Sequence, residues 1–289
     1  MASVSIFKQK NQSEAGTIHW LNECIKRGKR EIFSQVVDMN PGLAGELLRH
    51  NADNRNIREI KAGHFAADMS AGRWVFNGEP IIIAEDGQLN DGQHRLQAVL
   101  DANLVIPFLV VFGLPRDSRT TLDQGSARTA SDYLHMDGVI HSTLSAGIAR
   151  LVKAYEESDG RSIGKSKEYT NAQIVERVKA DEAIIEAAKY AQSVAKFSRG
   201  MVIPSIIGTC FYVFSEISPA DAKTYLDMVC VGENIKRGDP AFAVRDALAN
   251  IAVSSKAVRM EHIFRGWNKF RSGEKSKLSK SMGNFPAIS

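Results

Sequence analysis

Cysteine is scarce in this sequence, and its three occurrences, Cys24, Cys210 and Cys230, lie far apart. They form no CxxC pair and no spacing that suits zinc, and small secreted domains depend on denser cysteine frameworks. The scarcity excludes a disulfide scaffold and a zinc finger. It indicates that each cysteine is a small buried apolar residue rather than a nucleophile.

Long apolar runs are also missing. The N-terminal residues MASVSIFKQKNQS lack the apolar stretch of a secretory signal, and no window of the sequence is long and apolar enough to span a bilayer. We therefore expect a cytoplasmic protein that has no membrane partner.

The two common glycine-rich phosphate-binding motifs are absent as well. No GxGxxG occurs, and GRSIGKS at 160–166 places three residues between its glycine and GK, where a P-loop needs four. The segment also follows no strand signal, and it lies in the polar interval 159–170, which is typical of a surface loop. A P-loop NTPase is therefore not expected.

A strong excess of one charge is lacking too. The chain has 37 basic and 33 acidic residues, and the interval 41–135 has nine basic residues against twelve acidic ones. This balance argues against a broad DNA-binding face in that interval, since such faces need an excess of Lys and Arg. The basic residues there are nearly all arginine, which suits a small pocket for a phosphorylated ligand.

With 289 residues, the chain is long enough for one large or two smaller domains. We predict an α+β protein in four parts. These are an N-terminal helical extension at 1–40, a small mixed α/β domain at 41–135, an all-helical domain at 136–272 and a basic disordered tail at 273–289.

The N-terminal extension is predicted to hold one or two amphipathic helices, which begin near Thr17 and run to about residue 37. The basic cluster KRGKR at 26–30 is read as a solvated helix face that is broken at Gly28, and a nucleic-acid contact is the alternative.

In the mixed domain, the apolar residues follow a helical spacing in some segments and a strand spacing in others. Pro41 suits the first turn of a helix, and the apolar spacing after residue 56 predicts a second helix that ends at Gly72. Short strands are predicted at 81–84 and 88–90, and a longer strand at 105–112. A helix lies between the last two strands. His64 falls on the apolar stripe of the second helix and is expected to be partly buried.

The second half shows only helical patterns. Asp239 and Pro240 form a cap and a first helical turn. The last helix carries Trp267 and Phe270 among basic residues. These two aromatic residues either dock into the core or, with their basic neighbours, form a nucleic-acid surface.

The sequence DGQHR at 91–95 places several polar groups between a predicted strand and a predicted helix. A glycine at a helix start lets backbone N–H groups approach an anion, and the helix adds partial positive charge. Arg95 can hold a phosphate, while Asp91 and His94 can handle a proton or Mg²⁺. In the alternative reading, Asp91 only caps the helix, Gly92 only turns, and the remaining side chains are solvated.

A second polar group, LDQGSART at 122–129, contains Asp123, Arg128 and Thr129 around a glycine. Arg128 and Thr129 are candidates to complete the phosphate site. An ordinary turn with a helix cap is the alternative.

The segment GQHRLQA at 92–98 resembles the signature of the ParB/sulfiredoxin superfamily. The likeness to phage-type ParB-like proteins continues, in the same order, through NRNI, AGRW, GEPIII, PFLVVFGL and LDQGSART, and it covers roughly residues 41–135. The resemblance implies a ParB/sulfiredoxin-like fold for this interval.

The resemblance also implies site roles. ParB proteins bind the triphosphate of CTP with this box, and Gly92, Gln93 and Arg95 match their glycine, acid and arginine positions. Serine kinases of the superfamily carry a DGHHR-like box, which Asp91 and His94 also match. Sulfiredoxins have a cysteine where this chain has Gln93, so thiol-based phosphoryl chemistry is not expected.

These considerations lead to three hypotheses. The first is a protein that binds a nucleoside triphosphate, CTP or ATP with Mg²⁺, and acts in DNA transactions of a phage or mobile element. The second is a phosphotransferase or NTPase, with Glu59 and Asp68 as candidate bases and Asp91 as a metal ligand. The third is a nucleotide-independent DNA-binding regulator, which would use the helical domain, the basic N-terminal cluster or the tail. A homodimer is compatible with each of them.

Overall fold

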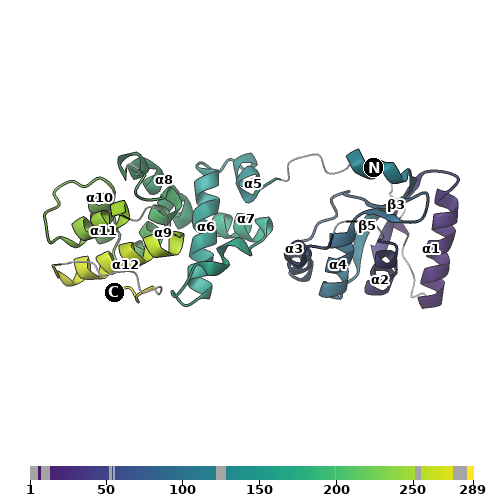
Figure 1. The fold of residues 1–289 in the computed structure, drawn as a ribbon, viewed down its shortest axis with the longest axis horizontal. Helices are drawn as coiled ribbons and strands as arrows, with labels where there is room; N and C mark the ends of the chain where they lie inside the picture. The colour runs from purple at the N-terminus through teal and green to yellow at the C-terminus, as the bar shows by residue number, and fades with distance from the viewer. Residues whose placement is uncertain are drawn as a thin grey trace. The chain divides into compact units, whose positions relative to one another are not determined.

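The computed structural model describes residues 6–7, 14–51, 54, 56–121, 128–198, 200–250, 255–275 and 285–289. The chain forms two compact units, which divide between Ser126 and Ala127. The first unit combines a sheet with helices, and the described part of the second unit is helical (Figure 1). The predicted α+β class is therefore confirmed.

The first unit contains five strands, four α-helices and one 3₁₀ helix in its described residues. In chain order these are β1 (Ile6–Phe7), α1 (Glu14–Gly28), β2 (Phe33–Met39), α2 (Pro41–Arg49), α3 (Glu59–Ser70), β3 (Ile81–Ala84), β4 (Leu89–Asp91), α4 (Gln93–Ala102), β5 (Ile106–Leu114) and η1 (Arg116–Thr121).

The five strands form one mixed sheet in the order β1-β2-β5-β3-β4. β1 is parallel to β2 and β3 to β5, whereas the pairs β2–β5 and β3–β4 are antiparallel. All four residues of β3 are buried, which suits the β-branched run IIIA in the interior of a sheet. The strands predicted at 81–84, 88–90 and 105–112 are confirmed.

β2 is a strand where the sequence suggested a helix. It pairs with β5 along its full length, from Phe33 opposite Phe112 to Met39 opposite Ile106. The Phe33 and Phe112 rings stack with their centroids 5.0 Å apart. FSQVVDM has apolar residues at alternate positions as well as at helical spacing, and the tertiary pairing selects the strand.

The predicted N-terminal extension is therefore part of the first unit. Leu21 and Cys24 of α1 are buried in its core. Gly28 lies so close to β5 that a Cβ atom there would stand 3.2 Å from the Gly113 nitrogen. Helix and sheet approach each other here through two glycines, and residues 14–39 belong with the α/β fold.

The second unit contains eight α-helices and two 3₁₀ helices in its described residues. In chain order these are α5 (Ala130–Met136), α6 (Ser142–Glu157), η2 (Gly164–Lys167), α7 (Asn171–Ala180), α8 (Glu182–Ala195), η3 (Lys196–Ser198), α9 (Pro204–Ser215), α10 (Pro219–Cys230), α11 (Pro240–Asn250) and α12 (Lys256–Ser272). The predicted all-helical second half is confirmed for these residues. The unit begins earlier than expected, because Ala130 and Leu134 of α5 are buried in its core.

The core of the second unit forms around α9 and α12. Trp267 is fully buried and stacks on Phe214 with a centroid distance of 4.4 Å and an interplanar angle of 5°. The Tyr225 hydroxyl donates a hydrogen bond to the Ile263 carbonyl. Of the two readings of the last helix, the structure therefore supports docking into the core for Trp267.

The last five residues differ from the expected disordered tail. Phe285 and Ile288 pack against the core of the second unit. Residues 276–284, which make up much of the predicted tail, lie outside the described residues. In the parts of the chain that the structure describes, no helix has the length and apolar character needed to cross a membrane.

We predict that Gly266→Ala destabilises the second unit. A Cβ atom at Gly266 would overlap with the Tyr225 hydroxyl and the Val244 side chain. Such overpacking costs about 1–3 kcal/mol. The free energy of unfolding, measured in urea, should fall accordingly.

Gly63→Ala is the matched control, because Gly63 lies in α3 and a Cβ atom there meets nothing within 4 Å. This change should raise stability by about 0.5–1 kcal/mol, as replacement of an exposed helical glycine does. An equal effect of the two substitutions would contradict the packing described for Gly266.

Candidate functional site

The DGQHR segment forms the tight turn between β4 and α4. Gly92 is the N-cap of α4 and has a left-handed φ of 111°, a conformation in which glycine is least strained. A Cβ atom on Gly92 would lie 3.0 Å from Cγ1 of Ile81. The glycine is therefore required by the turn itself and by close packing on β3.

The polar residues around this turn are buried. Asn90, Gln93, His94 and Arg95 are 7%, 6%, 6% and 8% exposed. Buried polar groups are costly unless they are hydrogen-bonded, so each of these side chains needs a partner within the protein. The reading in which His94 and Arg95 are merely solvated is wrong.

The segment that connects α2 to α3 supplies several of these partners. The Nδ2 atom of the Asn51 side chain donates a hydrogen bond to Oε1 of Gln93 at 2.9 Å. The Nδ2 atom of the Asn54 side chain donates to Oδ1 of Asn51 at 2.7 Å and to the Leu89 carbonyl at 2.6 Å. These bonds fold the connecting segment over the start of α4.

His94 makes the bond that joins two helices. Its Nε2 atom accepts a hydrogen bond of 3.0 Å from the backbone N–H of Arg58, the N-cap residue of α3. Because Nε2 accepts this bond, it carries no proton, and the imidazole proton lies on Nδ1. His94 is thus a fixed acceptor in this structure.

Arg95 is directed into the protein. Its Nη2 atom donates to the Pro80 carbonyl at 2.7 Å and to Oδ2 of Asp91 at 2.8 Å. Its Nη1 atom lies 3.7 Å from the Glu79 carboxylate. The arginine therefore holds the carboxylate of Asp91 and the segment that leads into β3. The Asp91 side chain remains 32% exposed.

Arg116 fixes the opposite side of the turn. Its Nη1 atom donates to the Leu89 carbonyl at 2.9 Å and to Oδ1 of Asn90 at 2.7 Å. The Asn90 amide donates to the Pro115 carbonyl and to the Ser118 hydroxyl, both at 3.2 Å. These bonds anchor η1 beside β4.

The helices α3 and α4 pack against each other (Figure 1), and the bond between Arg58 and His94 links their starts. The N-cap residues, Arg58 and Gly92, do not cap these helices with a side-chain hydrogen bond. The first N–H groups of a helix have no acceptor within it, and they give the helix start a partial positive charge. Two such starts meet at this point.

A metal site made by protein side chains alone is not present in the described part of the chain. There, no group of three or more His, Cys, Asp or Glu side chains is arranged to hold a metal ion. Magnesium is commonly held by one or two carboxylates together with substrate phosphates. The role of Asp91 as a metal ligand stays a prediction, and it requires a phosphate ligand.

The candidate bases on α3 differ in their surroundings. Asp68 accepts a hydrogen bond from Nε of Arg73 at 3.0 Å, whereas Glu59 is exposed in the first turn of the helix. His64 is half-buried, as expected, and its Nε2 atom has no hydrogen-bond partner in the described structure. Of the two candidate bases, Glu59 is the one that lies at the start of α3.

Arg128 and Thr129 belong to the second unit. Thr129 caps α5 in a reciprocal arrangement with Asp132, and the Arg128 carbonyl accepts a hydrogen bond from Asn171. Thr129 therefore acts as a helix cap, and a role for these two residues beside Arg95 stays a prediction. Asp123 lies outside the described residues.

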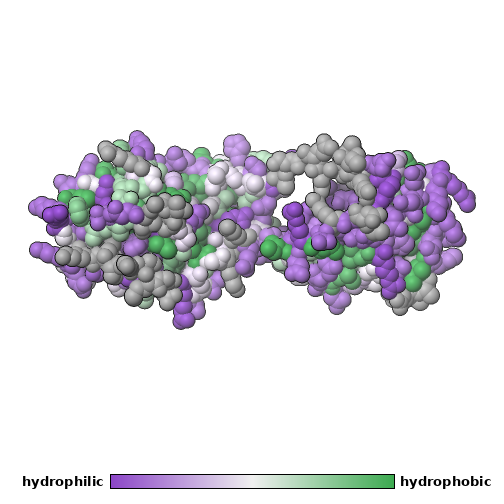
Figure 2. All heavy atoms as spheres, in the orientation of Figure 1, coloured by the Kyte–Doolittle hydropathy of each residue, from purple (hydrophilic) through white to green (hydrophobic). Residues whose placement is uncertain are grey.

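The basic cluster at 26–30 lies at the end of α1. Lys26 pairs with Glu23, and Arg27 pairs with Glu31 and lies over the Phe33 ring. The surface over α1 is mostly hydrophilic (Figure 2). These contacts favour the solvated helix face over a nucleic-acid contact.

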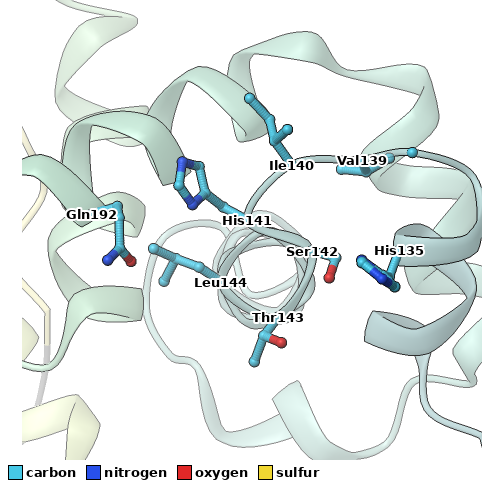
Figure 3. A pocket seen from close by; sticks show the side chains of 9 residues that line it. His135, Val139, Ile140, His141, Ser142, Thr143, Leu144 and Gln192 are labelled. Carbon is cyan, nitrogen blue, oxygen red and sulfur yellow. The ribbon is translucent and has the colours of Figure 1, made fainter.

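The second unit has a cavity of about 570 Å³ at the junction of α5 and α6 (Figure 3). His135 and His141 lie on opposite sides of the first turn of α6, and Gln192 of α8 completes the lining. No local sequence pattern indicates this cavity, because its residues come from a short turn and a distant helix. None of the predicted site residues lines it.

The thiols have no catalytic role in this structure. All three cysteines are buried. Burial raises the pKa of the Cys24 thiol to about 11 and that of Cys230 to about 12. Since the thiolate is the nucleophilic form, these cysteines are inert at neutral pH, as the sequence indicated.

Comparisons with known proteins find no match: no protein-family model, no curated protein and no solved structure matches the chain. The ParB/sulfiredoxin-like assignment therefore stays a prediction, and the chemistry of the site is argued from its own residues.

We predict that Arg95→Ala lowers the stability of the first unit. The change leaves the half-buried Pro80 carbonyl without this donor and Asp91 without its countercharge. Loss of hydrogen bonds to a charged group costs about 1.5–3 kcal/mol, and urea unfolding measures this loss.

Gln97→Ala is the control, because Gln97 lies on the same helix and bonds only to Asp101 on the exposed face. It should change the free energy of unfolding by less than about 0.5 kcal/mol. If Arg95→Ala were as stable as Gln97→Ala, Arg95 would not hold the turn together.

Proposed function

We propose that the first unit binds a nucleoside triphosphate, with its phosphates at the joint start of α3 and α4. One observation carries the proposal: the hydrogen bond between Arg58 and His94 brings together the start of α3 and the start of α4. Backbone N–H groups at helix starts, together with the positive end of the helix dipole, suit phosphate groups.

Arg58 lies at this point. It is exposed and has no carboxylate partner among the described residues. Arg116 of η1 is instead bonded to β4, through the Leu89 carbonyl and Oδ1 of Asn90. Arginine binds phosphate oxygens with two parallel hydrogen bonds, so Arg58 supplies the most accessible phosphate contact.

The residues of the DGQHR segment then have different roles. Gly92 forms the turn at the start of α4, while Gln93 and His94 hold the connecting segment in place. Arg95 positions Asp91, whose partly exposed carboxylate can bind the Mg²⁺ that accompanies a triphosphate. This assignment moves the phosphate contact from Arg95 to Arg58.

The resemblance of the DGQHR segment supplies the wider context of the proposal. It favours CTP or ATP as the nucleotide, and DNA transactions of a phage or mobile element as the process. Binding is proposed rather than turnover, because the Nε2 atom of His94 already accepts a hydrogen bond and so is not poised to take a proton.

We predict that CTP or ATP, with Mg²⁺, raises the thermal unfolding temperature of the protein. A ligand that binds only the folded state adds about 2.7 kcal/mol of stability at 100 times its Kd. The measurement is a thermal-shift panel of CTP, ATP, GTP and ADP, each with and without Mg²⁺. Isothermal titration of the nucleotide with the largest shift then gives its Kd.

Arg58→Ala should weaken nucleotide binding about tenfold, since a hydrogen bond to a charged group contributes about 1.5–3 kcal/mol. Arg49→Ala is the matched control, because Arg49 is exposed on α2 and pairs only with Glu46. The proposal fails if no nucleotide shifts the wild-type protein, or if both substitutions weaken binding equally.

A further inference from the structure

The last five residues of the chain pack against α6 and α12, on a surface formed by Tyr155, Phe264 and Asn268 that we call the groove. The Phe285 ring contacts the rings of Tyr155 on α6 and Phe264 on α12, with centroid distances of 6.2 and 5.4 Å. Ile288 packs against the same core. Figure 1 shows the C-terminal residues beside α12. Two apolar side chains, three positions apart, therefore anchor the tail.

Asn268 of α12 holds the backbone of this segment. Its Nδ2 atom donates to the Ala287 carbonyl at 2.6 Å, and its Oδ1 atom accepts from the Ser289 N–H at 3.2 Å. In an extended chain, the carbonyl of one residue and the N–H two positions later face the same side. A single side-chain amide thus binds one edge of the tail, as a neighbouring strand would.

The contacts combine two kinds of recognition. The two hydrogen bonds of the Asn268 side chain are independent of the tail's side chains, because they involve only the tail's backbone. The aromatic groove and the site for Ile288 select the side chains. Strand-addition sites recognise peptides in this way, with backbone bonds for affinity and apolar contacts for specificity.

The tail binds through a short segment that is close in sequence to α12. All of these contacts come from residues 285–289, and residues 276–284 connect this segment to the end of α12. Because this connection is short in sequence, it keeps the tethered segment near its site at an effective concentration of about 1 mM. A weak site is therefore occupied by the chain's own tail, although the same peptide, when free, would bind only at high concentration.

We propose that the groove formed by Tyr155, Phe264 and Asn268 is a peptide-binding site whose resident ligand is the chain's own segment 285–289. The partner that fits it is an extended peptide with an aromatic residue followed three positions later by an aliphatic one. Such a peptide displaces the tail when its concentration or affinity exceeds that of the tethered segment. This inference is independent of the proposed nucleotide site.

The test uses a fluorescent peptide with the sequence GNFPAIS and a full-length variant that carries Phe285→Ala and Ile288→Ala. The variant keeps its groove but loses both anchors of its own tail. Fluorescence anisotropy should show binding with a Kd on the order of 10⁻⁴ M. The wild-type protein should bind the peptide at least about tenfold more weakly, because its tail competes for the groove.

Three controls make the result specific. Adding Asn268→Ala to the double variant should weaken binding at least about tenfold, since it removes both backbone bonds. A peptide with alanine at the Phe285 position should not bind. Phe197→Ala, which changes an exposed aromatic residue outside the groove, should leave binding unchanged.

Two results would overturn the proposal. One is a folded double variant that does not bind the peptide, and the other is equal binding by the variant and the wild-type protein. If the double variant does not fold, hydrogen exchange in the wild-type chain decides. The Ser289 amide should exchange at least about tenfold more slowly than in the free peptide, and Asn268→Ala should remove that protection. Exchange at the free-peptide rate in the wild-type chain would also overturn the proposal.

Discussion

The candidate site depends on one hydrogen bond, from the backbone N–H of Arg58 to Nε2 of His94. It determines which imidazole nitrogen carries the proton, and it joins the starts of α3 and α4. Together with the bonds from Asn51 and Asn54, it also holds the connecting segment against β4. In the proposed nucleotide site, this bond is what brings the two helix starts together.

The polar residues of the DGQHR segment mainly build the site. Gln93, His94 and Arg95 are buried, and each makes contacts within the protein. The proposed phosphate contact comes instead from a flanking segment, at Arg58 before α3. Such a division is physically reasonable, because a buried polar network is rigid when every member is bonded, and a rigid frame would keep the proposed contact in position.

Elements whose apolar residues follow a single spacing, that of a helix or that of a strand, were predictable from the sequence. Prediction was less successful where both spacings fit, or where contacts between distant residues decide the structure. The run IIIA and the strand at 105–112 have a single reading, whereas 33–39 fits a helix or a strand until β5 pairs with it. The inward direction of Arg95 depends on the Pro80 carbonyl, fifteen positions away in the sequence. The anchoring of the tail likewise depends on α6 and α12, which no local pattern reveals.

The contact between Gly92 and Ile81 has a consequence for how such a motif is inherited. Any larger residue at this position would be strained by the left-handed backbone and would press against β3. Selection for a folded chain is therefore enough to retain the glycine, even in a descendant that has lost its ligand. Since Arg95 is also needed for internal bonds, both Gly92 and Arg95 are required by the fold itself. Substitutions that alter binding without unfolding the chain are therefore expected in the neighbouring segments.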